Sequence, residues 1–175
     1  FQQVYEAILQ GNQQMNLTRR TDPEAFWEKH LWDSLNGLAP WLTPAVAPTW
    51  ATERSTARVI DIGTGAGFPG LPAAIAFKLW QITLLDSTQK KVRFLSESVE
   101  SIGLKNVRAI ADRAEFLAHQ PSHRELYDIA LLRAVGPVPT CLEYALPLVK
   151  VGGVAVLYRG QRSDEDSHNA AAVAQ

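Results

Sequence analysis

The spacing of hydrophobic residues along the chain changes near Arg58. Before this point apolar side chains recur at helical spacing, which predicts a helix over residues 1 to about 14. A second helix is expected to have Thr21 or Asp22 as its cap and Pro23 at its first position, and to stop at residues 37–40. After Arg58, short and nearly continuous apolar runs alternate with amphipathic stretches, so strands and helices are expected to alternate.

The apolar runs predict strands at 58–62, 81–86, 106–110, 127–132 and 153–158, and the stretches between them predict helices at 69–78, 88–102, 113–119 and 138–149. Gly103 is expected to end the second of these helices as a left-handed cap, and Gly152 and Gly153 to turn into the last strand. This alternation predicts an α/β fold with a doubly wound, mostly parallel, Rossmann-like sheet. The carboxyl ends of its strands should line one crevice.

The pattern also predicts how the chain is organised. Residues 1–42 are expected to form an N-terminal helical extension, residues 43–57 a linker with Pro and small polar residues, and residues 58–175 the α/β domain. With 175 residues, 46% of them hydrophobic, the chain can bury a proper core. Because it begins at Phe1 and closes without a final strand, we expect a fragment that lacks the last strands of its sheet.

Charge and cysteine content narrow the class of protein. The 17 basic and 18 acidic residues nearly cancel, which argues against indiscriminate nucleic-acid binding and leaves room only for a focal RNA contact. The basic groups are Arg19 and Arg20, then Lys90, Lys91 and Arg93, then Arg159 and Arg162, offset by acids such as Asp164, Glu165 and Asp166. A single cysteine, no leader and no run of 18 apolar residues predict a cytoplasmic protein without membrane contact.

Candidate chemistry begins at the end of the first predicted strand, where Asp61 is followed by Gly63, Gly65 and Gly67. Glycines at this point let backbone N–H groups approach a ligand that a Cβ atom would exclude. About 20 residues later Asp86 ends the next strand, where a carboxylate can bind the two hydroxyls of a ribose. Together these features predict a cofactor that contains adenosine.

Two cofactors fit the glycines. Residues 65–70 satisfy the dinucleotide fingerprint G-x-G-x-x-G, but Pro69 has no N–H to offer a pyrophosphate. Counting from Gly63 gives D-x-G-x-G-x-G, with Asp61 expected at the strand tip, where a carboxylate suits the ammonium and sulfonium charges of S-adenosylmethionine. The local chemistry favours S-adenosylmethionine, and a nicotinamide-dependent oxidoreductase is kept as the alternative.

The other predicted strand ends carry further candidates. Ser87 and Thr88 can cap the next helix or contact the cofactor, and Lys90 and Lys91 form a solvated face or serve a ligand. After the third strand, the run from Asp112 to Glu115 reads as a capping box with Asp112 at the cap, and the same turn could also meet an adenine edge.

Arg133 directly follows the fourth predicted strand. It is expected in the crevice, able to stack on a base, hold a phosphate or bind the methionine carboxylate. It is the side chain most expected to matter for function.

Several familiar motifs are missing. The loop after the fourth strand is not the Asp/Asn-Pro-Pro-aromatic loop of amino-group methylation, and Cys141 falls at core spacing and is not expected to be a nucleophile. No tyrosine has the lysine partner of hydride chemistry, and His119, His123 and His168 lack metal-ligand spacing, so no metal is expected. A ring nitrogen with a free lone pair, such as guanine N7, needs no general base.

The motifs taken in order resemble the bacterial ribosomal small-subunit methyltransferase G family, also called glucose-inhibited division protein B. The segments that carry the likeness are Asn16-Leu17-Thr18, His30 with Asp33-Ser34, the glycine loop from Asp61 to Gly70, Leu84-Leu85-Asp86-Ser87 with Lys90 and Lys91, Arg93-Phe94-Leu95, and Arg133-Ala134. The resemblance implies a Rossmann-like class I methyltransferase that moves a methyl group from S-adenosylmethionine to N7 of one guanine in the 530 loop of 16S rRNA.

The resemblance also implies roles for residues at matching positions. The expected cofactor contacts are Asp61, Gly63, Gly65, Gly67, Phe68, Asp86, Ser87, Thr88, Ala114, Glu115 and Arg133, with Arg133 also the catalytic candidate, and the expected RNA contacts are His30, Asp33, Lys90, Lys91 and Arg159. His30 and Asp33 could instead pair on a helix surface. Arg159 stands where many members have Lys-Gly, which leaves its role open.

The expected partner is 16S rRNA or the small ribosomal subunit, and the protein is expected to act as a monomer. A non-catalytic interaction protein that keeps the cofactor site is a further alternative.

Overall fold

The computed structural model describes residues 1–42 and 56–159. Residues 43–55, which make up most of the predicted linker, lie outside the described residues. So do Arg162, His168 and the acids Asp164, Glu165 and Asp166. The helices are α1 (Gln2–Asn12), α2 (Pro23–Phe26), the π-helical η1 (Trp27–Trp32), α3 (Asp33–Asn36), α4 (Ala39–Leu42), α6 (Gly70–Ala76), α7 (Gln89–Ile102), α8 (Ala114–Leu117) and α9 (Val138–Ala145), and the strands are β1 (Arg58–Ile62), β2 (Gln81–Asp86), β3 (Val107–Ala111), β4 (Tyr127–Arg133) and β5 (Val149–Tyr158).

The strands form one parallel sheet in the order β3-β2-β1-β4-β5. The chain winds outward from β1 in one direction and from β4 in the other, so the order reverses between these two strands. In such sheets ligands bind at the carboxyl edge beside this reversal. The predicted α/β class and doubly wound parallel sheet are therefore confirmed.

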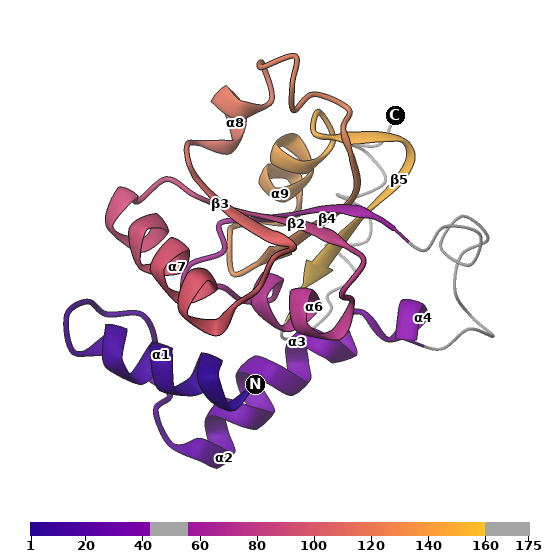
Figure 1. Ribbon diagram of the computed structural model, residues 1–175. Helices are drawn as coiled ribbons and strands as arrows, with labels where there is room; N and C mark the ends of the chain where they lie inside the picture. Colours follow the sequence, from indigo (N-terminus) through magenta and orange to yellow (C-terminus); the bar gives the residue numbers. More distant parts are fainter. Residues whose placement is uncertain (43–55, 160–175) are drawn as a thin grey trace.

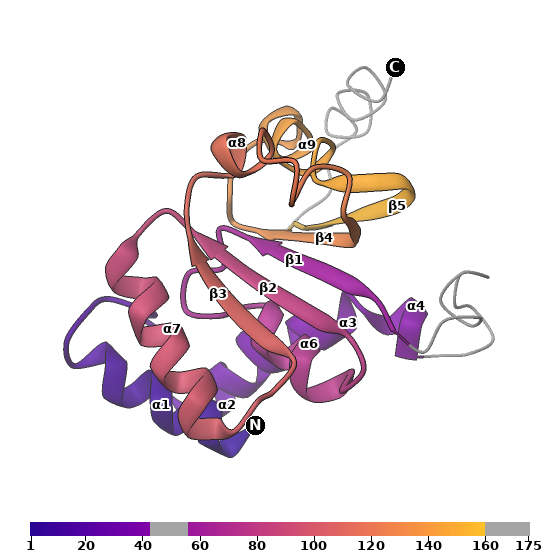
Figure 2. The same cartoon turned by 45° about the horizontal axis from the view of Figure 1, so that its top comes forward.

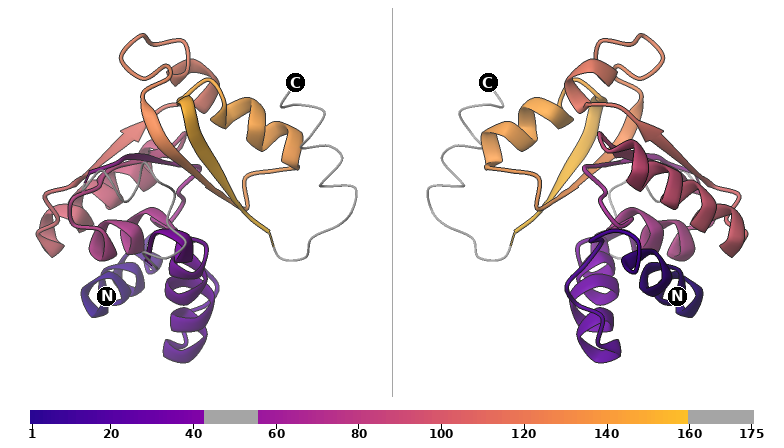
Figure 3. Two further views of the ribbon diagram at one scale, coloured as in Figure 1. Left: turned by 90° about the vertical axis from the view of Figure 1, so that its right-hand side faces the viewer. Right: turned by 90° about the vertical axis from the view of Figure 1, so that its left-hand side faces the viewer.

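Alternation along the strands separates two cores. Val59, Ile82 and Leu84 face one side of the sheet, whereas Ile60 and Leu85 face the other. Helices α6, α7 and the N-terminal helices cover the first side, and α8 and α9 cover the second (Figures 1 and 3). Because both faces are covered, the strands are apolar almost throughout, as a parallel sheet requires.

The N-terminal helices belong to the first of these cores. Val4 and Ile8 of α1 and Phe26 of α2 are fully buried in it. Gly11 lets α1 approach α7, since a Cβ there would lie 2.3 Å from the Phe94 ring. Residues 1–42 therefore pack directly on the α/β layer, and the division of the chain into extension, linker and domain stays a prediction.

Some element boundaries agree with the sequence-based expectations and others differ from them. Asp22 caps α2 and the helix stops at Asn36, with Gly37 as its C-cap, both as expected. A separate short helix, α4, follows and holds Pro40 in its first turn, where proline is tolerated. Gly152 and Gly153 lie within β5, which begins at Val149 and shifts register against β4 at this point. A backbone irregularity inside a strand leaves no periodicity signal for sequence reasoning to detect.

Candidate functional site

A cavity of about 170 Å³ opens at the carboxyl edge of the sheet. Five predicted cofactor contacts border it: Gly63, Asp86, Ser87, Ala114 and Glu115. The cavity is completed by Ile62, Leu85, Asp112, Arg113, Val135 and Tyr144. Tyr144 comes from α9, which is far from the glycine loop in the sequence. No sequence motif predicts that Tyr144 borders the cofactor cavity. The other predicted contacts do not border this cavity.

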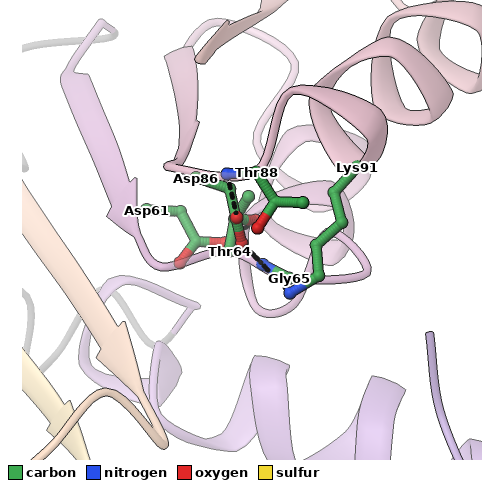
Figure 4. Close-up of polar contacts among 6 residues, drawn as sticks. All are labelled: Asp61, Thr64, Gly65, Asp86, Thr88 and Lys91. Atoms are coloured by element: carbon green, nitrogen blue, oxygen red, sulfur yellow. Dashed lines mark hydrogen bonds and ion pairs between the residues drawn. The ribbon is translucent and has the colours of Figure 1, made fainter. Parts of the chain in front are cut away.

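The glycine loop is held to the end of β2 by Asp86 (Figure 4). One carboxylate oxygen accepts from Gly65 N at 3.1 Å and the other from Thr88 N at 2.9 Å. Lys91 Nζ lies 3.6 Å from the first of these oxygens. Gly65 has φ +60°, a conformation in which a side chain is strained. Thr88 occupies the N-cap position of α7, one of the expected alternatives, but its hydroxyl makes no capping hydrogen bond.

From the sequence, Asp61 is expected at the tip of the first strand. In the structure Asp61 instead lies inside β1 and has no exposed surface. One carboxylate oxygen accepts from Thr64 Oγ1 at 2.6 Å and from Gly70 N at 2.8 Å. A Cβ at Gly70 would meet Leu84 at 2.2 Å and this oxygen at 2.8 Å, which explains the glycine. Asp61 therefore ties both ends of the glycine loop together from beneath. Burial raises the pKa of Asp61 to about 6.

The raised pKa predicts a pH effect on stability. Because the folded-state pKa of Asp61 lies above the ordinary value of 3.8, the folded protein holds the proton more tightly, and this stabilising contribution is lost as pH rises from about 4 to about 6. Asp61→Asn keeps an acceptor oxygen and cannot ionise, so its stability relative to wild type should rise by about 2–3 kcal/mol over that interval. Urea unfolding at pH 4, 5, 6 and 7 measures this difference. His30, described below, titrates in the opposite sense in both proteins, so only the difference is informative, and a constant difference would contradict the prediction.

The loop leaves little for a pyrophosphate to bind. Five of its backbone N–H groups donate within the protein, and Pro69 has none. The N–H groups in use are those of Thr64, Gly65, Gly67, Phe68 and Gly70. A dinucleotide needs free N–H groups at this helix start, so the geometry fits a cofactor without phosphate better.

The capping box predicted at Asp112 is absent. Arg113 is the residue before α8, and Asp112 instead accepts from Arg113 N at 2.8 Å and from Gln120 Nε2 at 3.0 Å. Glu115 forms an ion pair with the Arg113 side chain. The helix begins one residue later than expected, so the i, i+3 spacing does not coincide with its first turn.

Arg133 reaches the carboxyl edge from β4 but points toward the N-terminal helices. Its guanidinium donates to Lys29 O and to His30 Nδ1, each at 3.1 Å, and lies 5.4 Å from the centre of the Phe68 ring. Phe68 is only 4% exposed and stacks on His30 at 4.8 Å. Phe68, a predicted cofactor contact, thus packs between the glycine loop and η1.

His30 lies between Arg133 and the turn after α1. Since a guanidinium only donates, His30 Nδ1 accepts and its Nε2 carries the hydrogen, which is donated to Thr18 Oγ1 at 2.8 Å. Asn12 accepts from Thr18 N and donates to Thr18 O, which fixes this turn. Burial and Arg133 lower the pKa of His30 to about 4, so the ring is neutral at pH 7. His30 is therefore bonded across the fold, with no hydrogen bond to Asp33 among those found in the described residues.

A second cavity of about 560 Å³ lies on this side of Arg133. Lys29, Asp33, Tyr158 and Arg159 border it together with Arg133. Tyr158 donates to Ser34 O at 2.8 Å and packs so closely on Gly37 that a Cβ there would lie 2.4 Å from its ring. Two predicted RNA contacts, Asp33 and Arg159, are thus brought together with Arg133. By contrast, Lys90 donates to Gln14 O at 2.9 Å and Lys91 faces Asp86, so neither borders this cavity.

The described residues contain no group of three or more His, Cys, Asp or Glu side chains that could hold a metal ion. None of the helices in these residues is long and apolar enough to cross a membrane. Cys141 is 3% exposed in the second core, as its spacing predicted.

Comparison with known proteins gives a direct match. A family model described as GidB, rRNA small subunit methyltransferase G, matches residues 1–175. The chain belongs to the rRNA small subunit methyltransferase G family. Its relatives in Nostoc punctiforme and Microcystis aeruginosa, both named Ribosomal RNA small subunit methyltransferase G, are 53% and 55% identical over 167 residues. These matches cover 95% of this chain and 66% and 72% of the relatives, so the chain spans about two thirds of their length.

A solved structure also shares the fold. Coclaurine N-methyltransferase, bound to N-methylheliamine and S-adenosylhomocysteine, has a TM-score of 0.51 at 18% identity, over 59% of this chain and 30% of that one. Membership of the rRNA small subunit methyltransferase G family confirms the choice of S-adenosylmethionine over a nicotinamide dinucleotide.

Proposed function

We propose that this chain transfers a methyl group from S-adenosylmethionine to N7 of one guanine in the 530 loop of 16S rRNA. The family match over residues 1–175 carries the proposal. Two separate cavities, each bordered by residues at the carboxyl ends of strands, support it, because methyl transfer needs one site for the donor and another for the acceptor. The partner is 16S rRNA or the small ribosomal subunit, and the enzyme acts as a cytoplasmic monomer.

The first cavity holds the nucleoside of the cofactor in this proposal. A carboxylate has about four lone pairs, and the N–H groups of Gly65 and Thr88 take one on each oxygen of Asp86. One lone pair on each oxygen remains for a ribose hydroxyl, so the residues present fit the group. Gly63, Ser87, Ala114 and Glu115 border the rest of the nucleoside. Asp61, Gly65, Gly67, Phe68 and Thr88 act through the shape of the loop.

The second cavity receives the guanine. When bound, the cofactor would supply a sulfonium-activated methyl group, which a ring nitrogen with a free lone pair, such as guanine N7, can accept. No proton has to be removed first, so the residues of this chain need only align the base and exclude water. Arg133 orients the base, and Arg159 and Lys29 offer cations to neighbouring phosphates. His30 and Asp33 complete this RNA side, with Lys90 and Lys91 as outer contacts.

The test incubates the protein with radiolabelled S-adenosylmethionine and either deproteinised 16S rRNA or 30S subunits, and maps the label by nuclease digestion. One labelled 7-methylguanosine in the 530 loop is expected. Tight binding of S-adenosylhomocysteine without transfer to either substrate would overturn the proposal and favour the non-catalytic alternative. Analytical ultracentrifugation of the same sample tests the monomer, and limited proteolysis tests the boundaries proposed at 1–42, 43–57 and 58–175.

A further inference from the structure

A third cavity, of about 520 Å³, lies at the opposite edge of the sheet, where β1, β2 and β3 begin. Arg58, Lys105 and Arg108 border it, with Thr83 and Asn106 between them. Neither the cofactor site nor the cavity beside Arg133 includes any of these residues. We call this hollow the amino-edge cavity.

The strand register explains why the amino-edge cavity exists. Arg58 pairs with Gln81, and Thr83 pairs with Arg108, so these side chains lie in rows on the same face as Ile60 and Leu85. That face is covered by α8, which has only four residues, and by α9, which lies over β4 and β5 (Figure 2). The first residues of β1, β2 and β3 are therefore left without a helix over this face.

The lining of the amino-edge cavity is cationic. It contains three basic side chains and no carboxylate, and all three are exposed. Within the described ranges 1–42 and 56–159, none of the three forms an ion pair. The Asp128 carboxylate lies next to Arg58, since it accepts a hydrogen bond from Arg58 N at 2.8 Å. This carboxylate already forms an ion pair with Lys150.

Arg108 is held in place for a ligand by one of its own bonds. Its Nε donates to Thr83 Oγ1 at 3.1 Å, which leaves the two terminal amino groups of the fork without a hydrogen bond in the described part of the chain. A guanidinium fixed at Nε and open at its two ends suits bidentate binding of a phosphate.

We propose that the amino-edge cavity binds phosphates of the RNA backbone, as a second anchoring point for the substrate remote from the reacting base. This inference rests on the proposed function for the identity of the RNA. A strand of five residues spans about 17 Å, so the anchor and the methyl-transfer site lie within reach of one structured RNA segment. Exposed cations that bind phosphates are typical of backbone contacts that position a nucleic acid without reading its sequence.

The first experiment compares Lys105→Gln with Lys78→Gln. Both lysines are exposed and follow the end of a helix, but Lys78 follows α6 on the other side of the sheet and does not border the cavity. Dissociation constants for 16S rRNA are measured by filter binding from 50 to 200 mM salt. The Lys105 variant should have a shallower salt dependence by about 0.7–0.9 in log–log slope, and the Lys78 variant should match wild type.

The second experiment uses the triple variant Arg58→Gln, Lys105→Gln and Arg108→Gln, with Arg108→Lys as the charge-conserving variant. The triple variant should bind 16S rRNA about tenfold or more weakly, bind S-adenosylhomocysteine as wild type does, and methylate a short hairpin of the 530 loop at the wild-type rate. Arg108→Lys should keep most of the RNA affinity.

Wild-type RNA affinity and salt slope in the triple variant would overturn the inference and leave methyl transfer untouched. A lowered melting temperature without RNA, combined with unchanged RNA binding, would overturn it in favour of a segment of the protein itself as the occupant. Absence of methyl transfer in the wild type contradicts the proposed function instead, and the binding experiment still reports on the cavity.

Discussion

Replacing Arg133 with alanine is expected to lower the turnover number for methyl transfer about 100-fold or more and to leave affinity for S-adenosylhomocysteine within about threefold of wild type. The reason is the position of the guanidinium. It borders the cavity on the RNA side, not the one that contains Asp86. Loss of a group that aligns the acceptor nitrogen affects the transition state, and the separate nucleoside site remains intact. Single-turnover kinetics with saturating 16S rRNA and calorimetric titration measure the two quantities.

A matched control separates chemistry from docking. Arg133 also tethers β4 to the N-terminal helices through Lys29 O and His30, so its removal is expected to destabilise the fold by about 1–3 kcal/mol. Tyr158→Phe removes a comparable tether, the bond from β5 to Ser34 O, without removing a charge. If Tyr158→Phe reduces turnover as strongly as Arg133→Ala at equal stability, Arg133 acts by docking the helices and not by orienting the base.

Replacing Asp86 with alanine is expected to weaken S-adenosylhomocysteine binding about 100-fold or more. Two charge-assisted hydrogen bonds to ribose hydroxyls contribute about 1.5–3 kcal/mol each. The same carboxylate also holds Gly65 N and Thr88 N, so the glycine loop loses its tie to β2. Isothermal titration calorimetry with S-adenosylhomocysteine measures the loss, and circular dichroism checks that the variant is folded.

Asp112→Asn is the control for Asp86→Ala. Asp112 borders the same cavity and carries the same charge, but its oxygens accept from Arg113 N and Gln120. Its replacement should change cofactor affinity by less than about threefold, because asparagine keeps one acceptor oxygen. Equal losses in the two variants would mean that the cavity responds to its overall negative charge, and Asp86 would not be the specific ribose ligand.

Much of the fold was predictable because its signals are local. Apolar runs place β1 and β2 at their observed bounds, and Gly103 ends α7 with φ +78° as a left-handed cap. The motif order from Asn16 to Arg133 was sufficient to indicate the family, since sequence similarity does not depend on knowing any contact. Asp86 and Gly63 could be assigned to one edge because parallel strands place all their carboxyl ends together.

The sequence by itself determined the α/β alternation, the parallel sheet, the glycine loop and the family of this protein. Only the tertiary structure decided that Asp61 lies beneath the loop, that Arg133 bonds to His30, and that Tyr144 reaches the cofactor cavity. It also decided that Arg58, Lys105 and Arg108 share a hollow at the far edge of the sheet. The physical reason is distance along the chain: a hydrophobic pattern reports which face of a strand is buried, but the partner of each polar group comes from another element, and it is chosen by packing between layers.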